Sequence, residues 1–112
     1  MKQEARIPVL MYHRVGPASN AWEARYAIAP AAFAAHMQAL QRRGLRAVPI
    51  DDLVAWLEGG PPLPAEGVVV TFDDGFRGVR DHALPVMESL GWPFTVFLVS
   101  DLVGQDDAWT RD

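Results

Sequence analysis

The sequence predicts an α/β fold with a parallel sheet, in which about four strands alternate with about three helices. The first observation behind this is the order of the segments: short apolar runs alternate with longer segments of helical period along the 112 residues. The second is that each predicted strand is a continuous apolar run, which is typical of parallel strands with both faces covered. Helical crossovers between such strands are expected to be right-handed.

The first third of the chain predicts a strand, a loop and a helix. The apolar run at residues 7–12 predicts a buried strand that ends at His13. Residues 14–29 contain glycine, proline, serine and asparagine without a clear period, so they are expected to form a loop. Pro30 suits the first position of a helix, whose apolar stripe recurs at helical spacing until Gly44 ends it.

The rest of the chain predicts two more helices and three more strands. Asp51 is expected to cap a second helix, which ends at the Gly-Gly-Pro-Pro segment of residues 59–62. Residues 79–90 have a helical pattern with Pro85 inside it, which predicts a kink or a restart of the helix there. Three further apolar runs predict strands, at residues 45–50, 68–72 and 93–99.

The composition limits the class of protein. The net charge of −4 argues against a nucleic-acid partner, and the absence of cysteine excludes disulfides and cysteine-bound zinc. No segment approaches the roughly 20 apolar residues of a membrane span, so no transmembrane segment is expected. The N-terminus lacks the apolar stretch of a signal peptide. The protein is therefore expected to be cytoplasmic, unless a signal has been removed.

Two adjacent carboxylates, Asp73 and Asp74, follow the third apolar run directly. Ionised carboxylates at the end of a core strand are costly unless something binds or pairs them. In parallel α/β folds the chemistry gathers at the carboxyl ends of strands, where His13 is also expected. One carboxylate could then bind a metal while the other takes a proton from water. The alternative is a solvated Asp-Asp-Gly turn beside a structural histidine.

The remaining histidines and the tryptophans also have a functional and a structural interpretation. His36 and His82 lie on predicted helices without a partner at ligand spacing, so they are interpreted as ordinary helix residues. The first and last of the four tryptophans lie in predicted loops and are candidates for contact with a ligand, and the middle two are expected in the core. The four are Trp22, Trp56, Trp92 and Trp109.

Four motifs keep a common order and spacing along nearly the whole chain. They are residues 10–15 (LMYHRV), 33–44, 71–76 (TFDDGF) and 93–99 (PFTVFLV). Together they resemble the polysaccharide deacetylase family, also called the NodB-homology or carbohydrate esterase 4 family. The opening Met-Tyr-His is similar to the branch that acts on poly-N-acetylglucosamine-type exopolysaccharides. The resemblance implies that residues 1–112 form the N-terminal part of an irregular (β/α) barrel.

The resemblance also implies an activity: hydrolysis of N-acetyl groups from a hexosamine polysaccharide. Asp73 would be the general base that activates water, and Asp74 would bind a divalent metal, usually zinc, that polarises the acetyl carbonyl. His13 would act as the general acid, and Trp109 is expected to contact the substrate. An enzyme of this family with its signal removed would be extracytoplasmic.

One part of the family pattern is missing from the sequence. The family's second motif carries two metal-binding histidines at His-x-x-x-His spacing, and no such pair occurs here. Catalytic zinc takes three protein ligands, so we expect a partial domain truncated before that motif, inactive alone and possessing no bound metal. Its last strand, at residues 93–99, would be an unclosed barrel edge, which predicts self-association.

Two phosphoryl-transfer classes also use an aspartate at a strand end. Haloacid-dehalogenase-like phosphatases want a second aspartate two positions later, where Gly75 stands. A response-regulator receiver wants an acidic pair after the first strand, where His13 and Arg14 stand, and a late lysine, whereas Lys2 is the only lysine. Both are disfavoured. A non-catalytic half-barrel interaction module stays open as the alternative function.

Overall fold

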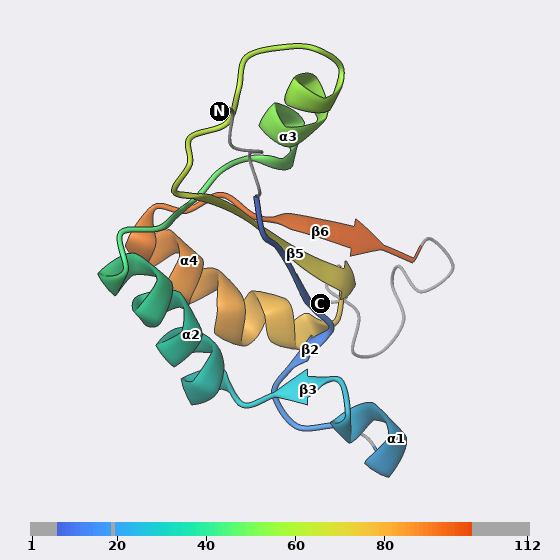
Figure 1. The fold of residues 1–112 in the computed structure, drawn as a ribbon. Helices are drawn as coiled ribbons and strands as arrows, with labels where there is room; N and C mark the ends of the chain where they lie inside the picture. The colour runs from blue at the N-terminus through green and yellow to red at the C-terminus, as the bar shows by residue number, and fades with distance from the viewer. Residues whose placement is uncertain (1–6, 19, 100–112) are drawn as a thin grey trace.

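The fold is centred on a four-stranded parallel sheet (Figure 1). The computed structural model describes residues 7–18 and 20–99. The sheet consists of β1 (Val9–Tyr12), β4 (Arg46–Ala47), β5 (Gly67–Asp74) and β6 (Thr95–Leu98). Strand β5 is central: β1 pairs along one side, and β4 and β6 pair with the beginning and the end of β5 on the other. The predicted parallel sheet is therefore confirmed.

The segment between β1 and the first long helix is more ordered than the sequence suggested. It contains β2 (Arg14–Val15), α1 (Ala21–Ala24) and β3 (Ala27–Ile28), and β2 pairs in parallel with β3. The side chain of Asn20 caps α1 by accepting a hydrogen bond from the Glu23 N–H at 2.9 Å. The prediction of a loop at residues 14–29 was wrong, because elements of two to four residues are too short to show a period.

Two of the three predicted helices were located correctly. Helix α2 (Pro30–Arg42) begins at its proline, where the missing N–H leaves no hydrogen bond unmade. The third helix has two parts, a π-helical turn η1 (Val79–Ala83) and α4 (Leu84–Leu90). The helix therefore changes its hydrogen-bonding pattern next to Pro85, which lies in the first turn of α4. The expected restart is confirmed.

Helix α3 (Ile50–Leu57) departs from the prediction at its start. Its N-cap is Pro49, in an extended conformation, and no side chain caps the helix, so the prediction of an Asp51 cap was wrong. The strand expected to reach residue 50 is also shorter, because the proline ends it and the helix begins at once. Helix α3 fully buries none of its residues, and Leu57 is 72% exposed.

The core lies between one face of the sheet and the helices α2, η1 and α4, which lie side by side in Figure 1. Alternate residues of β5 point into it, where the rings of Phe72 and Phe33 meet at 5.6 Å. The buried cluster comprises Val15, Phe33, Met37, Ala47, Val68, Val70, Phe72, Val79, Ala83 and Met87. This packing fixes the direction of β5 and so the position of its carboxyl end.

The opposite face of the sheet is only partly covered within the described residues. The central strand is buried there as well, since Val69 and Thr71 are 1% and 2% exposed. The Thr71 hydroxyl donates a hydrogen bond to the Leu10 carbonyl at 2.9 Å. On β1, however, Val9 is 44% and Met11 70% exposed. The expectation that both faces are covered therefore fails for β1 in the described part of the chain.

Candidate functional site

The carboxyl ends of β1 and β5 lie next to each other and bring the predicted residues together. Tyr12 pairs with Phe72, so the residues that follow, His13 and Asp73, are neighbours at the same edge. The Nε2 atom of His13 lies 3.3 Å from Oδ2 of Asp74, a contact that is an ion pair when the imidazole is protonated. The expectation that these three side chains share one strand edge is confirmed.

The backbone at Asp74 explains how both carboxylates can serve one site. Strand β5 extends to Asp74 instead of ending at residue 72 as predicted, and successive residues of a strand point to opposite faces. Asp74 has a φ of 70°, in the left-handed region, which aspartate tolerates better than most residues. Gly75 follows with a φ of 69°. These two residues break the alternation at the strand end, beside His13.

A pocket of about 360 Å³ opens at this edge. It is lined by Met11, Tyr12, His13, Trp22, Tyr26 and Asp73. Pockets of roughly 300–1,000 Å³ with mostly apolar walls and a few polar groups are the usual form of a small-molecule site. The His13 ring lies 5.2 Å from the Phe76 ring and 5.8 Å from the Tyr26 ring, so aromatic contacts hold the imidazole in place.

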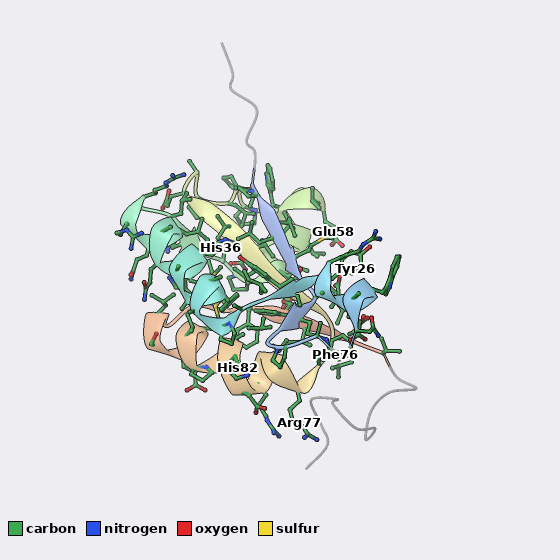
Figure 2. All side chains as sticks on the ribbon, turned by 90° about the horizontal axis from the view of Figure 1, so that it is seen from below. Tyr26, His36, Glu58, Phe76, Arg77 and His82 are labelled. Atoms are coloured by element: carbon green, nitrogen blue, oxygen red, sulfur yellow. The ribbon has the colours of Figure 1, made fainter. Side chains whose placement is uncertain are left out.

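A buried arginine contacts side chains from two segments near the pocket. Arg14 is 6% exposed, and its Nη2 atom lies 3.2 Å from Oε2 of Glu23 on α1. Its guanidinium group also lies over the Phe76 ring, 4.0 Å from the ring centroid. Figure 2 shows Phe76 and Tyr26 toward the side of the sheet where α1 lies. Arg14 therefore connects α1 to the segment that follows the two aspartates.

Sequence reasoning missed this second group of site residues. Arg14 directly follows the Met-Tyr-His motif and Phe76 directly follows Asp-Asp-Gly, so adjacency to the two motifs was an available signal. For Glu23 and Tyr26 the sequence offered no signal, because the short elements that position them have no period.

The other two histidines, labelled in Figure 2, contact other parts of the fold. His36, on α2, is 3.1 Å from the Tyr12 hydroxyl through its Nδ1 atom. His82 lies in η1, where its ring approaches Gly16. Burial raises the pKa of the Tyr12 phenol. Trp92 packs against the core as expected. The candidate substrate contact Trp109 lies outside the described residues.

The donor set of the described residues falls short of a zinc site. Asp74 and His13 offer an oxygen and a nitrogen donor, the chemistry that zinc accepts, but catalytic zinc takes three protein ligands. Within residues 7–18 and 20–99, no group of three or more histidine, cysteine, aspartate or glutamate side chains is placed to hold a metal ion. In the same residues, no helix is long and apolar enough to cross a membrane.

Comparison with known proteins agrees with this geometry. The sequence model of the family described as polysaccharide deacetylase matches residues 60–111, which include both aspartates. The solved structure of IcaB from Ammonifex degensii matches with a TM-score of 0.78 and 39% sequence identity, over 91% of this chain. The chain is therefore similar to polysaccharide deacetylases, in sequence over residues 60–111 and in structure over most of its length. The expected part of a (β/α) barrel is confirmed by the same structural likeness.

Two curated relatives show how much of a longer protein this chain matches. The YxkH protein of Bacillus subtilis (strain 168) is 24% identical over 111 residues, 99% of this chain and 38% of the relative. The poly-beta-1,6-N-acetyl-D-glucosamine N-deacetylase of Escherichia coli (strain K12) is 35% identical over 54 residues, 48% of this chain and 8% of that protein. The chain likewise spans 42% of the IcaB chain.

Proposed function

We propose that the intact protein carrying this chain hydrolyses N-acetyl groups from a hexosamine polysaccharide, and that Asp73, Asp74 and His13 belong to its active site. The observation that carries the proposal is the meeting of these side chains at the carboxyl ends of β1 and β5, beside an aromatic pocket. The likeness to polysaccharide deacetylases supports the reaction class. The likeness to the E. coli enzyme supports an N-acetylglucosamine polymer as substrate.

Asp73 is the better candidate for the general base. It lines the pocket, whereas Asp74 contacts His13. Within residues 7–18 and 20–99, no ion-pair or hydrogen-bond partner occupies the Asp73 carboxylate, so it is available to take a proton from water. The water oxygen then bonds to the acetyl carbon and the carbon–nitrogen bond breaks. His13, which lines the same pocket, supplies the proton that the departing amine requires, and acetate is released.

Asp74 is the candidate metal ligand. We propose that it holds a divalent metal, zinc by family resemblance, together with ligands from outside the described residues. A bound metal of this kind would polarise the acetyl carbonyl. His36 and His82 do not complete the site, because one contacts Tyr12 and the other approaches Gly16. The 112 residues alone are therefore proposed to hold no stoichiometric zinc and to release no acetate.

The test is acetate release from a β-1,6-linked N-acetylglucosamine oligomer by the intact protein, together with its zinc content. The variant Asp74→Asn should lose both the zinc and the activity while keeping the fold, because asparagine also tolerates the left-handed backbone. The matched control is Asp81→Asn, since Asp81 is an exposed carboxylate in η1 paired with Arg80. An Asp74→Asn protein that retains full zinc and full activity would overturn the assignment.

The non-catalytic half-barrel module remains the second candidate. The exposed apolar residues Phe97 and Leu98 of β6, 49% and 52% exposed, favour it because they suit an interface. The two candidates differ in one measurement. A module would bind a partner through β6 and release no acetate as the intact protein, whereas an enzyme would release acetate in the same assay.

A further inference from the structure

Two aromatic side chains beside the pocket contribute nothing to the core. Trp22 is 63% exposed and Tyr26 is 49% exposed, and α1, which carries Trp22, buries none of its residues. Large aromatic rings gain free energy mainly by burial, and they are enriched at binding surfaces for that reason. Two such rings in solvent next to a candidate active site therefore indicate a surface that a ligand covers.

The two rings form a corner in the lining of the pocket. Their centroids are 6.0 Å apart and their planes meet at 65°. Both rings line the same pocket as His13 and Asp73. The guanidinium group of Arg25 lies over the Trp22 ring, 4.9 Å from the centroid, and restrains the orientation of the indole. A ligand in this pocket can therefore contact both Asp73 and the aromatic corner.

Polar contacts hold the backbone beneath the corner in place. Glu23, next to Trp22, pairs with the buried Arg14 at 3.2 Å. The Arg14 N–H also donates a hydrogen bond to the Tyr26 carbonyl at 3.2 Å. These contacts anchor both ends of the segment to β2, which directly follows His13. Such an anchor lowers the ordering cost of binding, because the aromatic groups are already in position.

We propose that Trp22 and Tyr26 form a platform that binds one pyranose ring of an N-acetylated hexosamine polymer, next to the sugar whose acetyl group reaches Asp73. The proposal rests on the proposed function, and it adds the site for a neighbouring sugar. The C–H face of a pyranose ring is apolar and flat enough to stack on an aromatic ring, whereas its hydroxyl groups stay in water. A polymer chain can thus be held while one of its residues is at the carboxylates.

The test is calorimetric binding of a β-1,6-linked N-acetylglucosamine pentamer to the intact protein. Every variant, and the parent protein, carries Asp73→Asn so that the pentamer is not turned over. Trp22→Ala should weaken binding by roughly ten-fold, the scale of one lost aromatic contact and its buried area. Trp22→Phe keeps a ring and should bind within about three-fold of the parent. Leu57→Ala is the matched control, because it removes a 72% exposed apolar side chain from α3 and should change nothing.

Several outcomes separate this proposal from the proposed function. Pentamer binding that is equal in the parent and Trp22→Ala would overturn the platform, even if the enzyme releases acetate. A lipid surface is the other possible occupant of exposed aromatic rings, and phosphatidylglycerol vesicles test for it. If Trp22→Ala abolished vesicle binding and left pentamer affinity unchanged, the platform would be overturned. If the wild type releases no acetate but pentamer binding depends on Trp22, the platform stands and only the hydrolysis fails. Tyr26→Ala, measured in parallel, should weaken binding in the same direction.

Discussion

Substitution of the glycine in the turn after the two aspartates should lower stability by an amount that follows from the structure. Gly75 has a φ of 69°, and a Cβ atom added to it would collide with the Leu98 side chain of β6. Gly91, at the end of α4, has nearly the same φ of 67°, and an added Cβ would meet nothing within 4 Å. The two glycines therefore share the backbone penalty and differ in the contact.

Gly91→Ala should lower the free energy of unfolding by about 1 kcal/mol. Alanine in the left-handed backbone region costs roughly 1–2 kcal/mol, and the lower conformational entropy of the unfolded alanine chain offsets part of this cost. Gly75→Ala should lower it by about 2 kcal/mol, since the clash adds an overpacking cost of roughly 1 kcal/mol. The clash is with a side chain that is 52% exposed and can partly move, which keeps the addition small.

The assay is urea unfolding followed by circular dichroism, with equal slopes required for the comparison. Truncation of Leu98 removes the colliding atoms, so in a Leu98→Ala background Gly75→Ala should cost only about 1 kcal/mol, as Gly91→Ala does. If Gly75→Ala and Gly91→Ala differ by less than about 0.5 kcal/mol in the original background, the close approach of β6 to the turn is refuted.

Three further predictions concern the pocket and the sheet edge. Burial raises the pKa of Tyr12, so this tyrosine ionises at lower pH in the unfolded chain than in the folded one. The free energy of unfolding should therefore fall as the pH rises above about 10. Tyr12→Phe should reduce this dependence on pH, as measured by unfolding at a series of pH values. Arg14→Ala should lower the free energy of unfolding by about 2–4 kcal/mol in thermal unfolding, because it leaves Glu23 without this partner and removes the contact with Phe76. The control Arg42→Ala, at an exposed position, should lower it by less than about 0.5 kcal/mol. The 112-residue chain should self-associate through β6, and Phe97→Lys should shift it to monomer in sedimentation velocity, since lysine on an edge strand blocks pairing; a wild-type monomer at high concentration would contradict this.

The sequence carried enough information for the sheet and for three of the site residues. Continuous apolar runs mark β1, β5 and β6, although of these only β5 is buried on both faces within residues 7–18 and 20–99. Once β1 and β5 are parallel neighbours, the residues at their ends must meet, so His13 and the two aspartates could be brought together from sequence position alone.

The same reasoning could not predict which other residues surround the site. Glu23 and Tyr26 depend on α1 and β3, which have four and two residues and leave no periodic pattern. The start of α3 was misplaced for a related reason: an aspartate is a good cap in general, but here the fixed backbone of Pro49 begins the helix earlier. Local chemistry in short segments is decided by tertiary contacts that no single-sequence pattern encodes.

The most direct test of the central claim is the rate of acetate release by the intact protein with Asp73→Asn, measured at equal folded concentration on a β-1,6-linked N-acetylglucosamine oligomer. The loss of a general base typically lowers a rate by about 10²–10⁴-fold, and a fall in this range is the expected result. A rate within about ten-fold of the wild type would contradict the account, because the pocket carboxylate would then not be the group that activates water.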